Sequence, residues 1–347
     1  MKIIDAHTHI GNLKENFAPL YALAKRLDYD MLSVLSLQCG GNLLQNHICA
    51  LCKIKNPGTT YAFGGLDYKT GRDFLTQAKN LKAMGFDGIK MLEGKPTTRK
   101  NLGKPLDSPE YDEYYSYLEE TGFPVLYHVA DPPEFWDKEK IPGWALEHGW
   151  FYDESYVPYE QYYDEVESLL GKHPKLRAIF AHFFFLSGTP ERAQKFLDDH
   201  PSVYIDLTAG IEMYEDFSKD TAFWREFFIK NNNRLIFGTD SSDAPNLNDD
   251  GETQDGKVAL NGYAAMEIDF LRCDKEIAVF DKKINGINLP ENARERILAA
   301  NYQELVGKTP KPMDIGLLVK EADFIRDYLK GDDIKTLENI VAQISGK

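Results

Sequence analysis

The chain has 347 residues, of which 43% are hydrophobic and 27% charged, a composition typical of a globular protein with a full core. Its formal net charge of −15 and pI near 5.0 exclude nucleic acid and an anionic membrane surface as main partners, so a small molecule is the expected ligand. No apolar run approaches the roughly 18 residues that span a bilayer, and the start lacks the apolar core of a signal peptide, which together predict a cytoplasmic protein.

Short apolar runs rich in β-branched residues recur along the chain and predict eight strands. They are residues 2–7, 31–37, 61–67, 87–92, 123–131, 177–183, 202–209 and 234–240. Segments with helical spacing of apolar residues lie between them, and several end at Gly or Asn. They include residues 18–28, 71–85, 108–122, 159–173, 189–200 and 222–233. Apolar strands that alternate with single helices predict a parallel sheet covered on both faces, and eight such units favour a closed (β/α)8 TIM barrel.

Two connections are too long for simple turns. Residues 131–158, after the fifth strand, are crowded with aromatic residues and Pro, and residues 241–257, after the eighth, are polar and acidic. In a barrel both lie over the carboxyl face, where active sites are built. We interpret the first loop as a lid and the second as a flexible rim.

The chain ends with amphipathic segments that carry no evident chemistry. They are residues 291–307, 314–331 and 333–346. The sequence therefore predicts a catalytic barrel over residues 1–307 and a helical extension over residues 308–347. We expect the extension to pack on the barrel or against a second subunit of a homodimer.

The first predicted strand ends in "DAHTH", which places two histidines two residues apart. Residues i and i+2 of a strand lie on the same face, so His7 and His9 point the same way at the carboxyl end of the strand. Such a pair is either a pincer for a metal ion or an ordinary pair of surface or core histidines. The remaining strands decide between these readings.

Polar residues follow several other buried strands in the same way. His128 ends the fifth strand, His182 the sixth and Asp240 the eighth. Imidazoles and carboxylates in the top of a barrel core are costly unless they are paired or coordinated. Three histidines and a carboxylate suit one divalent ion, with zinc the first candidate and manganese, iron, cobalt or nickel as alternatives. For Asp240 alone, the competing reading is a helix N-cap.

These motifs carry a family resemblance. "DAHTH", "YHVAD", "AHF" and "FGTDSS" on strands one, five, six and eight resemble the amidohydrolase superfamily, in particular the amidohydrolase-related branch that includes enzymes of the aminocarboxymuconate-semialdehyde decarboxylase type. The resemblance covers roughly residues 1–305, and "ILAANYQELVG" is similar to the closing helix of that branch. It implies a barrel enzyme with metal bound by His7, His9, His128 and Asp240.

The resemblance also implies a mechanism. A bound divalent ion lowers the pKa of its water from about 15.7 to about 7, which gives a nucleophile at neutral pH. Asp240 then transfers the proton, while His182 binds a metal or acts on the substrate. Lys90 on the fourth strand is either carboxylated and bridges two ions, or faces the substrate beside a single ion. We favour one ion.

Weaker candidates lie on the loops. Trp136 in the predicted lid, and Glu212 and Tyr214 after the seventh strand, are candidate substrate contacts. A packed aromatic lid accounts equally well for Trp136, and a solvated helix start for the other two. Lys95 and Arg99, with Lys90, suggest a carboxylated substrate.

The function favoured by the sequence is metal-dependent hydrolysis of a small amide, lactone or ester. The first alternative is a metal-dependent, non-oxidative decarboxylase, because that branch uses nearly the same ligands for loss of carbon dioxide. A barrel that keeps its metal but only binds ligands is the second alternative, and the presence of His182 and Asp240 argues against it.

Overall fold

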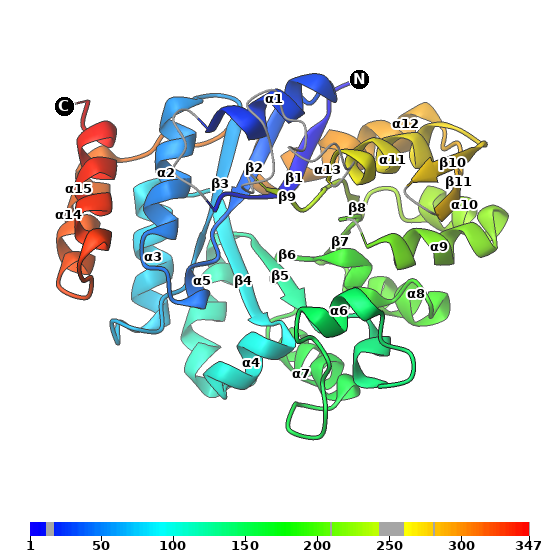
Figure 1. Cartoon of the computed structure of the whole chain (residues 1–347), viewed down its shortest axis with the longest axis horizontal. Helices are drawn as coiled ribbons and strands as arrows, with labels where there is room; N and C mark the ends of the chain where they lie inside the picture. Colours follow the sequence, from blue (N-terminus) through cyan, green and yellow to red (C-terminus); the bar gives the residue numbers. More distant parts are fainter. Residues whose placement is uncertain (12–16, 209, 243–259, 280–281, 347) are drawn as a thin grey trace.

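The computed structural model describes residues 1–11, 17–208, 210–242, 260–279 and 282–346, and of residues 260–263 the backbone only. A sheet of nine parallel strands lies at its centre (Figure 1). The strands are β1 (Ile4–His9), β2 (Met31–Leu35), β3 (Thr60–Gly65), β4 (Gly88–Gly94), β5 (Val125–Val129), β6 (Ala178–Phe180), β7 (Tyr204–Asp206), β8 (Leu235–Ile236) and β9 (Ser241–Ser242). All eight predicted strands are confirmed.

The eighth predicted strand closes the sheet into a barrel. Within it, β8 pairs with β7, and the two residues that follow it, β9, pair with β1, although the sequence predicted them as the start of the rim loop. Between them, the Ala6 N–H donates to the carbonyl of Phe237 at 3.1 Å and the Asp240 N–H donates to the carbonyl of His7 at 2.8 Å. The prediction of a (β/α)8 TIM barrel is therefore confirmed.

Helices cover the outside of the barrel, as alternation of strands and helices requires. They are α1 (Ala18–Arg26), α2 (Gln45–Lys55), α3 (Phe74–Met84), α4 (Pro96–Leu102), α5 (Asp112–Thr121), α7 (Tyr159–Lys172), α8 (Pro190–Asp199), α9 (Ile211–Lys219), α10 (Thr221–Lys230), α11 (Leu260–Arg272), α12 (Glu291–Glu295) and α13 (Asn301–Val306). Helix α3 shows how the sequence sets their ends. The Asp73 side chain accepts the Thr76 N–H at its start, and Gly85 ends it with φ of 96°.

An apolar plug fills the lower part of the barrel. Ile4 and Ala6 of β1 pack there with Leu126 and Ile179 from across the sheet. Helix α13 closes this end, and its Tyr302 hydroxyl is 2.7 Å from Ser33 Oγ of β2. With the lower end sealed, polar groups at the carboxyl ends of the strands face the open upper end.

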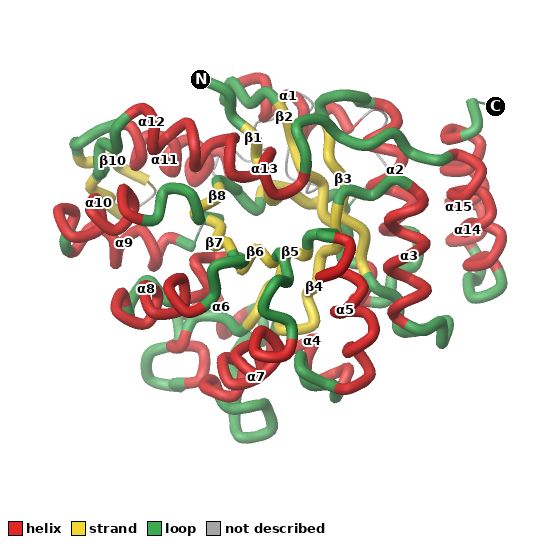
Figure 2. Tube along the Cα trace, turned by 180° about the vertical axis from the view of Figure 1, so that it is seen from behind, coloured by secondary structure: helices red, strands yellow, loops and turns green. Residues whose placement is uncertain are grey.

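Two helices at the end of the chain pack outside the barrel. Helices α14 (Ile315–Arg326) and α15 (Asp332–Ile344) lie against α3 and α2, far from the barrel mouth (Figures 1 and 2). The buried His47 ring of α2 lies 3.0 Å from the carbonyl of Leu318 in α14, through Nε2. The extension therefore covers barrel helices, while the division at residue 307 stays a prediction.

The predicted lid forms a small folded unit. It contains the short helical turn η4 (Pro133–Trp136) and helix α6 (Gly143–Glu147), joined by an apolar cluster around Phe135, Ala145 and Tyr152. Of the predicted rim, residues 243–257 lie outside the described residues. Beyond it, β10 (Glu276–Val279) and β11 (Lys282–Asn285) form an antiparallel hairpin. Within the described ranges, no helix combines the length and apolar character needed to cross a membrane.

Candidate metal centre and active site

Three of the predicted ligands meet at the mouth of the barrel. Oδ1 of Asp240 lies 3.1 Å from His9 Nε2 and 3.6 Å from His7 Nε2. Among the described residues these three form the group that can hold a metal ion, with ligand atoms within 4.8 Å of one another. Two imidazoles and one carboxylate are donors that zinc and other first-row divalent ions accept.

The Nδ1 atoms of both histidines form hydrogen bonds on the side of each ring that faces away from this centre. His7 Nδ1 is 2.9 Å from Asp206 Oδ2, and His9 Nδ1 is 3.0 Å from the carbonyl of Leu35. A carbonyl and a carboxylate only accept hydrogen bonds, so each Nδ1 carries a proton. Burial lowers the pKa of His7, and a ring protonated at Nδ1 alone turns the lone pair of Nε2 inward. Two such lone pairs beside a carboxylate repel one another unless a cation lies among them. The donor set therefore fits a divalent metal ion.

The β1 backbone explains how His7 comes to face the inside. The pairing of β1 with β2 shifts register between Asp5 and Thr8, as at a β-bulge, which re-aims side chains. Ile4 and Ala6 belong to the inner plug, yet the His7 ring also reaches Lys90 of β4 and Asp206 of β7 across the barrel. A strictly alternating strand would not place all three side chains inside.

Lys90 lies within the centre. Its side chain is 1% exposed, and Nζ is 3.1 Å from His7 Nε2. Burial lowers the pKa of Lys90 to about 8, against the opposing effect of the Asp240 and Asp206 charges. The ammonium thus faces the same lone pair that a metal ion would use. Both readings of Lys90, as a carboxylated bridge and as a substrate contact, require this position.

Asp206 is the important residue that the sequence analysis missed. It is fully buried at the end of β7 and accepts the His182 N–H at 2.8 Å and the Thr208 N–H at 3.1 Å, besides contacting His7. A carboxylate behind a ligand histidine fixes the ring and raises its basicity. The sequence signal that could have identified Asp206 is its position, because it is a polar residue at the end of an apolar strand, as His128 and His182 are.

His182 stands on a left-handed turn. Residues 182–185 have φ values of 57°, 52°, 53° and 51°, a conformation that costs roughly 1–2 kcal/mol for each residue other than Gly. The bond from the His182 N–H to Asp206 and the burial of Phe183 and Phe184 offset this cost. The turn brings the Phe185 ring into a stack with His182, 5.3 Å between centroids.

His128 contacts His182 rather than the three-residue group. Its Nδ1 is 3.2 Å from His182 Nε2, and its Nε2 is 3.1 Å from Asp131 Oδ1. Asp131 in turn accepts both Lys95 Nζ, at 2.9 Å, and the Tyr152 hydroxyl of the lid. Both nitrogens of His128 are thus engaged, so its role as the fourth metal ligand stays a prediction.

This network fixes proton positions. Burial alone would raise the pKa of Asp131, but Lys95 and His128 hold it well below its usual value, so it is ionised and accepts Nε2–H of His128. His128 Nδ1 then accepts a proton from His182 Nε2, which leaves His182 Nδ1 as a lone pair. Burial, followed by the neighbouring His128 ring, lowers the pKa of His182 to about 3, so its ring is neutral at pH 7.

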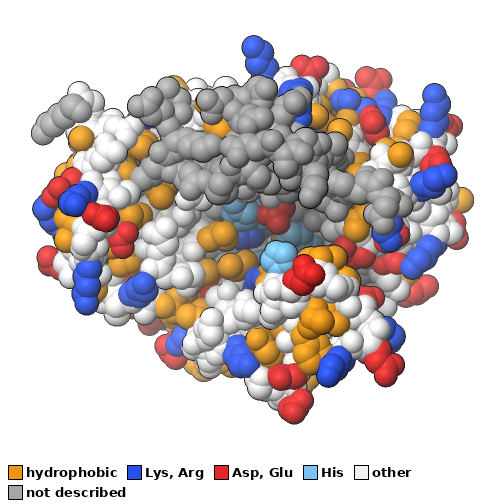
Figure 3. Space-filling model, in the orientation of Figure 1, with side chains coloured by type: hydrophobic (Ala, Val, Ile, Leu, Met, Phe, Trp, Pro, Cys, Tyr) orange, Lys and Arg blue, Asp and Glu red, His pale blue; other side chains and the backbone are white. Residues whose placement is uncertain are grey.

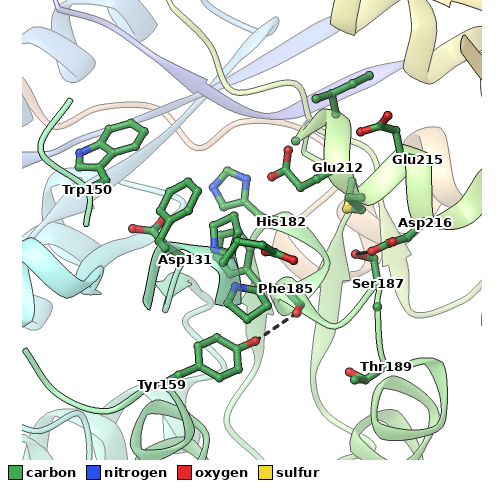
Figure 4. A pocket seen from close by; sticks show the side chains of 18 of the residues that line it. Asp131, Trp150, Tyr159, His182, Phe185, Ser187, Thr189, Glu212, Glu215 and Asp216 are labelled. Carbon is green, nitrogen blue, oxygen red and sulfur yellow. Dashed lines mark hydrogen bonds between the residues drawn. The ribbon is translucent and has the colours of Figure 1, made fainter. Parts of the chain in front are cut away.

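A cavity of about 1010 Å³ opens above these residues, and Asp240, His128 and His182 contribute to its wall. Figure 3 shows histidine and acidic side chains gathered in a hollow near the centre of this face. Glu212 lines the cavity, as expected, together with Glu215 and Asp216 of the same helix (Figure 4). The size is that of a pocket for a small organic molecule.

The structure places two predicted substrate contacts away from the cavity. Tyr214 is fully buried, donates its hydroxyl to the carbonyl of Leu207 at 2.8 Å and packs on Phe217 in the core. Trp136 does not line the cavity; its indole N–H donates to Val157 at 3.0 Å, and its ring packs on Tyr152 within the lid. The packed aromatic lid, the alternative reading of Trp136, is the one observed.

Lys95 and Arg99, the basic residues that suggested a carboxylated substrate, each form an ion pair within the protein. Arg99 is 6% exposed and binds Glu165, with Nη2 2.9 Å from Oε1. Lys95 is bound to Asp131, and its Nζ lies 4.4 Å from the centre of the Trp150 ring. Neither cation is available to a substrate without breaking an ion pair.

The fold and the site together define a TIM-barrel protein of the metal-dependent amidohydrolase type. The family model described as amidohydrolase matches residues 4–307, which is most of the chain. The chain therefore belongs to the amidohydrolase family, and the resemblance seen in its motifs is confirmed. A search of curated proteins gives no significant match.

Solved structures share the fold at low sequence identity. A TIM-barrel protein from Bordetella bronchiseptica is 13% identical with a TM-score of 0.54, covering 88% of this chain and 98% of its own. A 2,6-dihydroxybenzoate decarboxylase from Rhizobium is 13% identical with a TM-score of 0.52 and the same coverage of 88% and 98%. A dihydroxybenzoic acid decarboxylase from Polaromonas sp. JS666, solved with manganese and the inhibitor 2-nitroresorcinol, has 13% identity, a TM-score of 0.52 and coverage of 88% and 96%.

Proposed function

We propose that this protein is a metal-dependent hydrolase that cleaves a small amide, lactone or ester in the cavity above His7, His9 and Asp240. The observation that carries the proposal is the convergence of two inward imidazole lone pairs and a carboxylate, each histidine fixed by a hydrogen bond on its far side. A structural pair of histidines would have no need of that arrangement beneath an open cavity.

The protein's own residues supply proton transfer and orientation. When bound, a divalent ion supplies a Lewis acid that acidifies water and polarises a carbonyl group. Asp240 accepts the proton of the attacking water and returns it to the leaving nitrogen or oxygen. Lys90 has N–H groups at the same centre and can stabilise the negative charge that develops on the carbonyl oxygen.

His182 acts as an acceptor in this scheme. Its Nε2–H is directed to His128, so the free Nδ1 can hold a proton or a metal but cannot donate to an oxyanion. His128 is the predicted fourth ligand. We propose a single ion because Lys90 Nζ lies 3.1 Å from His7 Nε2 and so takes up room within the centre. Zinc suits the nitrogen donors best, and manganese, iron, cobalt or nickel fit the same set.

Non-oxidative decarboxylation of a small carboxylic acid is the second candidate. It is supported by His182, whose free Nδ1 at the cavity wall can take up a proton from water and pass it to the carbon that loses carbon dioxide. The two decarboxylases named above share the barrel fold with this chain. The same metal ligands serve both reactions, so the fate of the substrate separates them.

The test is turnover in water enriched in oxygen-18, with a panel of esters, lactones, amides and aromatic carboxylic acids. Hydrolysis places one solvent oxygen in the acid product. Decarboxylation releases carbon dioxide and places one solvent hydrogen on carbon. We expect oxygen incorporation that is lost on chelation and in His9→Ala. Carbon dioxide without solvent oxygen in the organic product would instead establish the decarboxylase, and turnover that survives chelation would refute metal dependence.

A further inference from the structure

The cavity wall carries more acidic than basic side chains. Outside the metal centre its acids are Asp131, Glu134, Glu160, Glu212, Glu215 and Asp216, and its bases are Lys95, Arg192 and Lys219. Each base is paired with one of these acids at 2.9 Å or less: Lys95 with Asp131, Arg192 with Glu160, and Lys219 with Asp216. Glu215 is paired with Lys282, at 2.9 Å. Each lysine and arginine among the described residues of the wall is thus already in an ion pair.

Glu212 has no such partner. Among the described residues, no lysine, arginine or histidine forms an ion pair with its carboxylate, which bonds only its own backbone N–H. The side chain is mostly buried, and burial, with smaller effects of Glu134 and Asp216, raises its pKa to about 6. A mostly buried carboxylate without a cation is unfavourable unless a ligand supplies one.

The local backbone holds Glu212 toward the cavity. Its carboxylate lies over Gly210, where a Cβ would collide with Oε1. Because Gly210 has no side chain, the carboxylate packs against the start of α9 and lines the cavity. Figure 4 shows Glu212, Glu215 and Asp216 across the cavity from Trp150 and Asp131.

Aromatic rings form much of the rest of the wall. Phe135, Trp144, Trp150, Tyr159 and Phe185 line the cavity. The faces of such rings attract cations, as Lys95 over Trp150 already illustrates. A cavity with an unpaired carboxylate and aromatic faces is suited to an organic cation rather than an organic anion.

We propose that the substrate carries a protonated amine or guanidinium group, and that Glu212 binds this group while the reacting carbonyl lies toward His7, His9 and Asp240. Only the placement of the reacting carbonyl rests on the proposed function; the binding of a cation by Glu212 does not. The cation subsite is defined by Glu212, the aromatic rings elsewhere in the cavity wall and the lack of a free basic residue among the described side chains of the wall.

Direct binding tests the subsite without relying on turnover. Benzylammonium, benzyl alcohol and benzoate have similar size and differ in charge, and their dissociation constants at pH 8 can be measured by calorimetry on the full chain. We expect benzylammonium to bind about 10- to 100-fold more tightly than the other two, the range of a charge-assisted hydrogen bond. Equal affinities, or tighter binding of benzoate, would overturn the inference, and this comparison requires no variant.

Variants then locate the subsite. Glu212→Gln should abolish the preference for benzylammonium, whereas Glu215→Gln, which removes an equal charge one turn further along α9, should retain it. An unchanged preference in Glu212→Gln, or an equal loss in both variants, would refute the assignment to Glu212. If benzylammonium binds as expected but no compound is hydrolysed, the proposed function fails and the cation subsite stands.

Discussion

Replacing Asp206 by asparagine should weaken metal binding by about 10- to 100-fold, the usual effect of losing a carboxylate behind a ligand histidine. Asp206 contacts the His7 ring and accepts backbone N–H groups of His182 and Thr208. Asparagine keeps one acceptor oxygen but places an NH₂ group where the second oxygen was. Either His7 Nδ1–H or the backbone donors then lose their acceptor.

The size of the effect follows from these contacts. A buried donor left without its acceptor costs roughly 1–3 kcal/mol, and a tenfold change in affinity corresponds to about 1.4 kcal/mol. If asparagine forces His7 into the other tautomer, the proton moves to Nε2 and the lone pair leaves the centre. Asp206→Asn should therefore lower metal affinity more than it lowers the free energy of unfolding.

The assay is competition between the protein and a chromogenic chelator, with urea unfolding of the metal-free protein as a parallel measurement. Asp5→Asn is the matched control, because Asp5 is 1% exposed and bonds the backbone of His7 and Thr239 but does not touch the ring. We expect Asp5→Asn to lower stability with a smaller change in affinity. A folded Asp206→Asn variant with wild-type metal affinity would refute the role given to Asp206.

Three further predictions concern Arg99, Tyr214 and Asp131. Arg99→Met should lower the free energy of unfolding by about 3–5 kcal/mol, because it leaves Glu165 buried without its partner, and urea unfolding would show it; an effect confined to KM would restore the substrate role. Tyr214→Phe should cost about 1 kcal/mol of stability and leave KM unchanged, since only the bond to Leu207 is lost; a raised KM in steady-state kinetics would contradict the core assignment. Because the pKa of Asp131 in the folded protein lies below its ordinary value of 3.8, the ionised carboxylate stabilises the fold above pH 3.8, and this stabilisation is lost as the pH falls. The free energy of unfolding, measured from pH 6 to pH 3, should therefore fall less steeply in Asp131→Asn than in the wild type. Parallel curves would show that Asp131 is not linked to folding.

The barrel could be predicted because its strands are nearly continuous apolar runs. A strand buried on both faces leaves this pattern whatever its neighbours are, and punctuating residues such as Gly85 mark where helices end. Three of the site residues were visible for the same reason. His7, His9 and Asp240 interrupt or follow apolar strands, where an unpaired polar group is costly.

Asp206 was not predicted because its partners are distant in sequence. It lies 199 residues from His7, and only closure of the barrel brings β7 and β1 to the same mouth. The left-handed turn at residues 182–185 gives no sequence signal either, since "HFFF" contains neither Gly nor Asn. Packing of Phe183 and Phe184, together with Asp206, selects that conformation.

The packed positions of Trp136 and Tyr214 have a common cause. Both follow strands that feed the barrel mouth, but the direction of an aromatic side chain in a loop or short helix depends on tertiary packing. For Tyr214 a signal existed, because Tyr214 and Phe217 are three residues apart and lie on one face of a helix. That spacing is typical of a buried helical face.

We propose that His7, His9 and Asp240 hold one catalytic divalent ion. Elemental analysis of the untagged, purified protein, before and after reconstitution with zinc and manganese, tests it most directly. We predict about one equivalent of metal per chain in the wild type, and loss of that metal in folded His9→Ala and Asp240→Asn variants. A folded wild-type protein that retains no metal after reconstitution, or variants that keep a full equivalent, would contradict the claim.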